Sequence, residues 1–379
     1  MIHKSLVIMA AFVLACSTRA SAATLYAASD GSSSGSCTGA WASACTLARA
    51  LDVSSEGDEI WVKAGTYPPI SLVNGVRLIG GFVGTETAAS QSDPSTNTTT
   101  INGGGSRAVT SVNHSPLTML RGFRVVNGRD DGYAWGGGGM LLQDSSALIV
   151  QTEFQGNTGA FWGGAASIVG NSSPHFVNCK FIGNGEMTIG SEEVRTVAGG
   201  AVFLQQGSPK FTNCLFAGNK AGDGGALANN GGSVSFYNCT IVGNQATVGI
   251  GGGVADPDGT VELRNSILWN NSAVRGGDQI YNEPDKVSVV RYTDVQGSFS
   301  GDSVLNSDPL FAQGYKLGND SPCKNAGSNG YIPSTDVADL DWDTVTNEAL
   351  PKDLDMKTRK VLLVVDMGCF ETPASGGAN

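Results

Sequence analysis

Between residues 136 and 277 the chain repeats one short arrangement of apolar and polar positions. Each copy opens on a pair of glycines followed by a small or aliphatic residue. The four clearest copies are Gly163-Gly164-Ala165, Gly199-Gly200-Ala201, Gly224-Gly225-Ala226 and Gly252-Gly253-Val254. Self-similarity at a spacing of roughly 25 residues predicts a repeat architecture in which each copy is one structural unit.

Later in each copy an apolar residue precedes a glycine and an asparagine, as in Phe181-Ile-Gly-Asn184. The apolar positions are Phe154, Phe181, Phe216, Ile241 and Leu268, and the asparagines are Asn157, Asn184, Asn219, Asn244 and Asn271. We expect the apolar side chains to stack inward and the asparagines to align at a turn, where stacked amides can hydrogen-bond along the column. A unit of this length holds three short strands and three turns. We therefore predict an all-β fold, a single-stranded right-handed parallel β-helix. A propeller or a sandwich would need frequent hairpin turns of the Asn-Gly or Asp-Gly type, and these are not the dominant pattern.

The segments around the repeats predict caps at both ends of the coil. We interpret residues 23–110 as an N-terminal cap with the first coils, and residues 111–299 as the regular repeats. The spacing of Leu47 and Leu51 predicts a short helix over residues 41–51 that covers the open end. Residues 300–371 are expected to close the far end, because an uncovered last rung is an exposed strand edge. Residues 372–379 are expected to be a disordered tail.

The first 22 residues are expected to be a secretory signal. A short apolar run from Leu6 to Ala15 precedes Ala20-Ser21-Ala22, which fits a small-residue cleavage site. The alternative is an outer-membrane lipoprotein held through Cys16. No later segment is long and apolar enough to span a bilayer. The localisation predicted from this leader is therefore the extracellular medium or the outer cell surface.

Composition agrees with a turn-rich β protein and argues against one class of partner. Glycine accounts for 53 of 379 residues, and only 15% of residues are charged. The formal net charge is −11, and it becomes more negative once Lys4 and Arg19 leave with the signal. Nucleic-acid binding needs a basic surface, so we expect no nucleic-acid partner.

The cysteines other than Cys16 fall into three groups. Cys37 and Cys45 lie close together and are expected to pair, because disulfides persist in an exported protein. Cys323 and Cys369 are a second candidate pair, which would hold the C-terminal region. The remaining three occupy the same place in successive copies, where we favour buried thiols over a disulfide between neighbours: Cys179, Cys214 and Cys239.

Several motifs together resemble a known group of proteins. They are Leu78-Ile-Gly-Gly-Phe-Val-Gly-Thr-Glu86, the two repeated patterns, and three C-terminal motifs at residues 305–311, 321–327 and 366–371. The combination resembles bacterial β-helix surface proteins with a choice-of-anchor C-terminal region, and the repeats alone resemble polymorphic outer-membrane proteins. The resemblance implies a pectin-lyase-like β-helix that is exported. It implies no shared reaction and no catalytic residues.

Candidate chemistry lies where the copies differ, between each asparagine and the next glycine pair. In a coil these connections project from one corner, which is where binding sites of solenoids often form. The candidates for carbohydrate binding there are Arg129, Tyr133, Trp135, Trp162 and Asp223. Aromatic rings beside charged groups suit a sugar chain. The competing interpretation is that the tryptophans cover the core edge and the charges only solvate loops.

Catalysis at the same corner is an alternative, with weak candidates Asp130, Asp131, Glu192, Glu193, Arg195 and Lys220. A glycosidase needs two carboxylates roughly 5 to 9 Å apart, and a lyase needs a base and a group that neutralises the uronate. His175 and Lys210 hold equivalent positions but are expected to be outward-facing strand residues. Asp339-Leu-Asp-Trp-Asp343 faintly resembles a Ca²⁺ loop without its usual glycine and glutamate. We therefore assign no cofactor, with Ca²⁺ as the remaining possibility. The predicted function is binding of extracellular polysaccharide or adhesion, and the alternative is a polysaccharide lyase or glycoside hydrolase.

Overall fold

The computed structural model describes residues 22–372 except positions 131, 133–134, 190–191, 284–285, 287 and 361–363. In the two strands of residues 186–195 it describes little more than the backbone. The expected signal segment, Cys16 and the expected tail after Thr372 lie outside the described residues.

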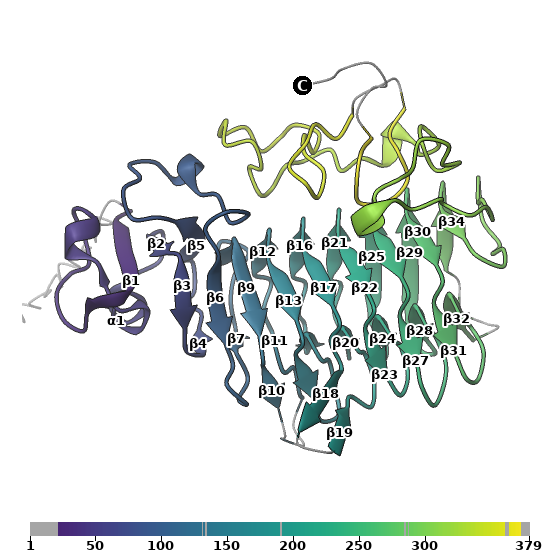
Figure 1. Ribbon diagram of the computed structural model, residues 1–379, viewed down its shortest axis with the longest axis horizontal. Helices are drawn as coiled ribbons and strands as arrows, with labels where there is room; N and C mark the ends of the chain where they lie inside the picture. The colour runs from purple at the N-terminus through teal and green to yellow at the C-terminus, as the bar shows by residue number, and fades with distance from the viewer. Residues whose placement is uncertain are drawn as a thin grey trace, which may run out of the picture.

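Three parallel sheets wind around one core and form a long coil (Figure 1). We call these sheets A, B and C. Each turn of the chain passes from sheet C to sheet A to sheet B, as β20, β21 and β22 do. Sheet A contains, in order, β1 Thr24–Ser32, β2 Glu59–Lys63, β5 Arg77–Phe82, β8 Met119–Arg121, β12 Leu148–Val150, β16 His175–Val177, β21 Lys210–Thr212, β25 Ser233–Tyr237, β29 Thr260–Arg264 and β33 Val289–Arg291.

Sheets B and C complete each coil with strands of two to four residues. Sheet B contains β3 Gly65–Tyr67, β6 Thr99–Asn102, β9 Phe123–Val126, β13 Glu153–Gln155, β17 Lys180–Ile182, β22 Leu215–Ala217, β26 Thr240–Val242, β30 Ile267–Trp269 and β34 Asp294–Val295. Sheet C contains β4 Ile70–Ser71, β7 Val109–Val112, β11 Met140–Gln143, β15 Ala166–Val169, β20 Val202–Leu204, β24 Leu227–Asn229, β28 Val254–Asp256 and β32 Ile280–Asn282.

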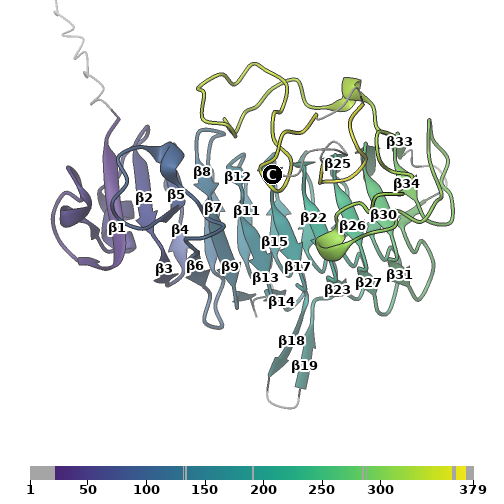
Figure 2. The same cartoon turned by 45° about the horizontal axis from the view of Figure 1, so that its top comes forward.

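The connections from sheet B to sheet C carry the remaining strands, and we call this edge of the coil the BC corner. Two short parallel ladders lie there: β10 Arg129–Asp130 with β14 Thr158–Gly159, and β23 Lys220–Ala221 with β27 Gln245–Ala246 and β31 Ser272–Ala273. The longest insertion forms an antiparallel hairpin of β18 Glu186–Ile189 and β19 Glu192–Arg195. The hairpin projects away from the coil (Figure 2).

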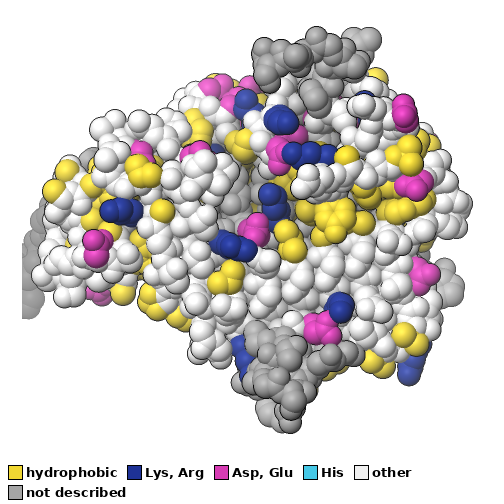
Figure 3. Space-filling model, in the orientation of Figure 1, with side chains coloured by type: hydrophobic (Ala, Val, Ile, Leu, Met, Phe, Trp, Pro, Cys, Tyr) yellow, Lys and Arg dark blue, Asp and Glu magenta, His cyan; other side chains and the backbone are white. Residues whose placement is uncertain are grey.

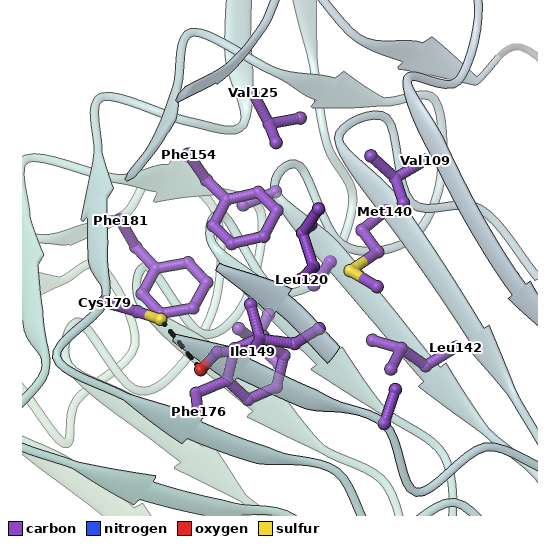
Figure 4. Packing of buried hydrophobic residues seen from close by; sticks show 14 of the residues in the cluster. Val109, Leu120, Val125, Met140, Leu142, Ile149, Phe154, Phe176, Cys179 and Phe181 are labelled. Atoms are coloured by element: carbon purple, nitrogen blue, oxygen red, sulfur yellow. Dashed lines mark hydrogen bonds between the residues drawn. The ribbon is translucent and has the colours of Figure 1, made fainter. Parts of the chain in front are cut away.

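The predicted inward stacking of apolar residues is confirmed (Figure 4). On sheet B the rings of Phe154 and Phe181 are 5.1 Å apart and almost parallel, and Phe181 stacks on Phe216 at 4.5 Å. A second stack, on sheet A, was not singled out from the sequence and contains Phe176, Phe211 and Phe236. Each of these rings is fully buried. Burial of one such side chain contributes about 2–3 kcal/mol, so the two stacks are a main source of the coil's stability.

The predicted amide ladder also forms. Asn184 Nδ2 donates to Asn219 Oδ1 at 3.0 Å, and Asn219 Nδ2 donates to Asn244 Oδ1 at 2.8 Å. The same carboxamide oxygens accept the backbone N–H groups of the preceding coil. All donors and acceptors at this buried turn are therefore paired, as burial of polar groups requires.

The glycine pairs allow neighbouring coils to touch at the backbone. A Cβ on Gly200 would lie only 2.2 Å from the carbonyl oxygen of Gly225, so no other residue fits. The structure corrects the alignment of the fourth copy by one residue. Val254 pairs with Leu227, which makes Gly251 and Gly252 the equivalent pair rather than Gly252 and Gly253.

The α-helix of the N-terminal cap begins later than the sequence pattern predicts. Residues 41–43 form the 3₁₀ helix η1 Trp41–Ser43, and the α-helix α1 Leu47–Val53 begins only after Thr46, whose side chain accepts the Arg49 N–H. Leu47 and Leu51 face the core as expected. The expected disulfide between Cys37 and Cys45 is present.

The C-terminal region does not simply close the far end. Isolated bridges from Asp302 and Leu305 extend sheets A and B by one more rung, as a cap should. Residues 306–372, which we call the returning segment, then run back over the coil (Figures 1 and 2). Its described residues are irregular apart from the 3₁₀ helices η3 Gln313–Tyr315 and η4 Asn329–Tyr331.

The returning segment is docked by asparagines that begin each passage from sheet A to sheet B. Asn213 donates its Nδ2 to the Lys352 carbonyl at 2.7 Å, and Asn265 donates to the Ser328 carbonyl at 2.9 Å. Asn178, Asn213, Asn238 and Asn265 all adopt φ near 50°. Apolar contacts between the outer face of sheet A and Ala338, Leu340 and Leu350 complete the docking. The returning segment thereby covers part of the outer face of sheet A.

The second expected disulfide is absent. Cys323 and Cys369 are both free and buried, and they belong to different apolar clusters. Cys323 instead hydrogen-bonds to Asp294 Oδ2 at 3.1 Å. Cys179, Cys214 and Cys239 are free and fully buried, as favoured from the sequence.

Candidate functional site

The BC corner holds most of the residues predicted for function, but several of them have structural contacts. Asp130 is buried, forms an ion pair with Arg107 and accepts the Gly132 N–H at 2.8 Å. Trp162 stacks on Phe203 with ring centroids 4.5 Å apart. Lys220 Nζ lies 2.7 Å from Glu186 Oε2. The carboxylate of Asp223 accepts the Ile250 N–H at 2.8 Å.

Other candidates at the corner do not converge on one groove among the described residues. Trp135 is 40% exposed, and the backbone register places Gly136 rather than Trp135 beside Trp162. Arg129 lies in β10, in a different coil from Lys220. Glu192, Glu193 and Arg195 lie on β19 of the projecting hairpin, and their side chains are outside the described residues, as are Asp131 and Tyr133. The roles predicted for these residues stay predictions.

His175 and Lys210 are neighbours on the outer face of sheet A, as expected. The imidazole Nε2 of His175 lies 2.9 Å from Thr212 Oγ1. Burial, with a smaller contribution from the charge of Lys210, lowers the pKa of His175 to about 3. Such a weak base is a poor proton acceptor for a lyase reaction near neutral pH.

A cleft of about 810 Å³ opens on the other side of sheet B, away from the BC corner. Its floor is the outer surface of β9, β13 and β17, including Arg124, Glu153 and Lys180. One wall is the loop between β5 and β6, with the 3₁₀ helix η2 Ala89–Gln91 and residues 92–99. The opposite wall is the returning segment, at residues 340–342 and 352–356. Figure 3 shows basic and acidic side chains gathered in a hollow below that segment.

The floor of the cleft alternates in charge across neighbouring coils. Strand register places Glu153 between Arg124 and Lys180. Arg124 Nε lies 3.1 Å from Glu153 Oε1, whereas Lys180 forms no ion pair with any described residue. Lys352, from the returning segment, also has no ion-pair partner among the described residues. Two lysines thus line the same cleft without an ion-pair partner among the described residues.

The wall formed by the returning segment is held in place by a buried arginine. Arg121 is 1% exposed and donates from Nη1 to the carbonyl oxygens of Ala338 and Asp339, at 2.9 and 3.2 Å. Its guanidinium carbon lies 3.7 Å from the ring centroid of Trp342. Burial lowers the pKa of Arg121 to about 9, so the side chain is charged at neutral pH. The side chain of Arg121 therefore fixes both the backbone of this wall and the ring of Trp342 to the coil.

This cleft was not found from the sequence. The repeat pattern marks only residues that recur, and Arg124, Glu153 and Lys180 occupy one strand position with three different side chains. The other wall comes from residues more than 150 positions later, at 340–356. An alignment of outward-facing positions, coil by coil, would have revealed the alternation of charge but not the segment that covers it.

Comparisons with known proteins agree with the fold. A family described as "Right handed beta helix region" matches residues 119–294, and a family described as "Protein of unknown function (DUF1565)" matches residues 30–184. A crystal structure of pectate lyase Pel9A superimposes with a TM-score of 0.55 at 11% sequence identity, covering 93% of this chain and 97% of that one. No curated protein sequence matches the chain.

These matches and the three parallel sheets confirm the predicted fold class, a right-handed parallel β-helix. No helix within the described residues is long and apolar enough to cross a bilayer.

Proposed function

We propose that the protein is an exported carbohydrate-binding protein that holds a segment of an acidic polysaccharide in the cleft between sheet B and the returning segment. The observation that carries this proposal is the pair of lysines without ion-pair partners among the described residues, Lys180 on the floor of the cleft and Lys352 on one wall. Their positive charges suit the carboxylates of a polyuronate.

The rest of the cleft supplies what a sugar chain needs besides charge. Glu153 and Asp355 can accept hydrogen bonds from hydroxyl groups, and Gln151 adds an amide beside them. Trp342 lines the cleft and offers an aromatic surface to a sugar ring. The stacking of the Arg121 guanidinium on this ring keeps it in place. The open shape suits a polymer that extends beyond the site at both ends rather than a small molecule enclosed on all sides.

Binding at the BC corner is the less favoured location. There Asp130, Trp162 and Lys220 are engaged by neighbouring residues of the coil, so they would have to exchange existing contacts for a ligand. The corner therefore remains the second place to look if variants of the cleft leave binding unchanged.

A lyase reaction in the same cleft is the second candidate function. The structural similarity to a pectate lyase shows the fold alone, but a cleft lysine that first releases its own proton is the kind of group that can then act as a general base beside a bound uronate. The two candidates differ in products, because binding leaves the polysaccharide intact, whereas elimination breaks it into one fragment with an unsaturated uronate and one with a new reducing end.

One experiment separates these functions. The chain without its first 22 residues is incubated with polyuronates and with neutral polysaccharides, and binding, ultraviolet absorbance and reducing ends are all measured. We expect retention of polyuronates without new products, and about tenfold weaker binding for Lys180→Ala and Lys352→Ala. Lys210→Ala removes an exposed lysine outside the cleft and is the matched control. Products from the wild type that disappear in the cleft variants would establish catalysis instead.

A further inference from the structure

The loop that forms the cleft wall contains a group of carboxylates that lie close together. Asp336, Asp341 and Glu348 each offer one oxygen atom, and these three atoms lie within 4.8 Å of one another. Asp341 is shared with a second group of the same kind, which adds Asp339 and Asp343. Five carboxylates within thirteen residues repel one another unless positive charge lies between them.

The burial of these oxygens distinguishes the group from an ordinary acidic surface. Asp336 is 0% exposed, and its Oδ1 has no hydrogen-bond partner, whereas its Oδ2 accepts the Leu340 N–H at 2.6 Å. Asp341 Oδ1 and Glu348 Oε1 are also buried without a partner. A buried, unsatisfied carboxylate oxygen is costly, and here three neighbouring carboxylates each have one, so the arrangement calls for a ligand that all three side chains bind at once.

The nearest fixed positive charge does not satisfy these oxygens. Arg121 directs Nη1 to the backbone carbonyls of Ala338 and Asp339 and its face to Trp342. Within the described residues it forms no ion pair with the carboxylates of the group. Burial first, and then the charges of Asp341 and Asp339, raise the pKa of Asp336. Burial followed by the four neighbouring aspartates likewise raises the pKa of Glu348.

We propose that Asp336, Asp341 and Glu348 form a Ca²⁺ site that fixes the wall of the cleft, with Asp339 and Asp343 beside it. The donor set consists of oxygens alone, without histidine or cysteine, which excludes a zinc-type site and suits a hard cation. Ca²⁺ accepts six to eight oxygen ligands in irregular geometry, so three carboxylates with neighbouring groups and water can complete its shell. Mg²⁺ is less suitable because it requires a near-ideal octahedron and retains its own water.

Trp342 allows a direct test of Ca²⁺ binding, because it lies between Asp341 and Asp343 in the sequence. Tb³⁺ replaces Ca²⁺ at oxygen sites and emits when a nearby tryptophan is excited. We expect the chelator-treated protein to show Tb³⁺ emission that Ca²⁺ displaces, with one Ca²⁺ bound per chain and a Kd on the order of 10⁻⁴ M, as in other extracellular modules. Saturation should raise the melting temperature by about 3 °C.

Asp336→Asn and Glu348→Gln should each weaken Ca²⁺ binding at least tenfold, whereas Asp320→Asn, at an exposed aspartate of the same segment, should leave it unchanged. Glu348→Gln keeps the experiment decisive if Asp336→Asn fails to fold, and circular dichroism checks both. Equal Ca²⁺ affinity in wild type and Glu348→Gln, or no Ca²⁺ binding by the wild type, would overturn the proposal. Metal binding is measured without polysaccharide, so the result is independent of the proposed function.

Discussion

At the residue scale, buried polar side chains that repeat from coil to coil determine how well the coils stack. Asn219 is a member of the amide ladder with neighbours on both sides. It donates to Asn244 and to the Phe181 carbonyl, and it accepts from both nitrogens of Asn184. The Phe-x-Gly-Asn pattern predicted this ladder because identical residues at a fixed spacing must occupy one column. The docking role of Asn178 and its equivalents could not be predicted, because their partners do not repeat.

Asn219→Ala should lower the free energy of unfolding by about 3 kcal/mol, because it leaves several buried donors and acceptors without partners. The measurement is the midpoint of urea unfolding followed by circular dichroism. Asn230→Ala, at an exposed asparagine in a nearby turn, should stay within about 0.5 kcal/mol of the wild type. Similar midpoints for the two variants would show that the ladder contributes little.

From the lowered pKa of His175 we predict a specific dependence of stability on pH. Its pKa in the folded protein is about 3, below the usual value of 6.5, because the imidazole is buried. Between those values the unfolded chain binds a proton that the folded chain does not, so stability decreases as pH falls from 6.5 toward 3. His175→Gln has no titrating group and should lose less stability between pH 7 and pH 4, by up to about 1.4 kcal/mol per pH unit. Urea midpoints of both proteins across this range provide the comparison, and parallel curves would contradict the prediction.

The free cysteines give a third prediction at this scale. All five thiols other than Cys16 are buried, and burial raises the pKa of Cys214 and Cys239 well above the usual value. The thiolate is the reactive form, so the folded chain without its leader should not react with an aromatic disulfide reagent. After unfolding in guanidinium, five thiols should react. Three reactive thiols would mean that Cys323 and Cys369 pair after all.

At the element scale, the repeated strands were predictable and the returning segment was not. Each strand pairs with equivalent strands in the coils before and after it. A local pattern such as Phe181-Ile-Gly-Asn184 is therefore enough to predict the position of its strand in the coil. The returning segment docks through main-chain carbonyls, for example those of Ala338 and Lys352, and every residue has a carbonyl. Arg121 is one of the coil residues that mark its docking place, and a single arginine in a strand gives no signal of a partner about 217 residues away.

Arg121→Lys should therefore loosen the cleft wall while leaving the coil intact. Lysine cannot reproduce the planar arrangement that contacts Gln151, two carbonyls and Trp342 together. We expect faster hydrogen exchange at residues 336–350 and a change in Trp342 fluorescence, with unchanged exchange in β16 and β21. Arg275→Lys, at an exposed arginine of the BC corner, is the control. Unaltered exchange at residues 336–350 would show that apolar contacts alone dock the segment.

At the scale of the whole molecule, the coil provides a rigid floor and the non-repeating segments provide the walls of the cleft. The sequence located function at the BC corner because insertions collect there, and the projecting hairpin confirms that the longest insertion lies on that edge. The cleft arises elsewhere, from segments that are far apart in the chain. Prediction from a repeat therefore succeeds for the scaffold and fails for a site that forms only when a distant segment folds back.

The charge of the whole molecule gives the last prediction. The protein carries a net charge of −11 and would repel a polyuronate, whereas Lys180 and Lys352 attract it locally. Raising salt from about 10 to 150 mM shortens the screening length from about 30 to 8 Å. This removes the long-range repulsion before it weakens contacts within the cleft. We expect the association rate to rise over that range, and affinity to fall again toward about 1 M, where the screening length is about 3 Å.

In the double variant of Lys180→Ala with Lys352→Ala, the fall in affinity at high salt should disappear because no cleft ammonium groups remain to be screened. Surface plasmon resonance on immobilised polyuronate measures both effects. An affinity that only decreases with salt, equally in both proteins, would place the contact at some other basic group.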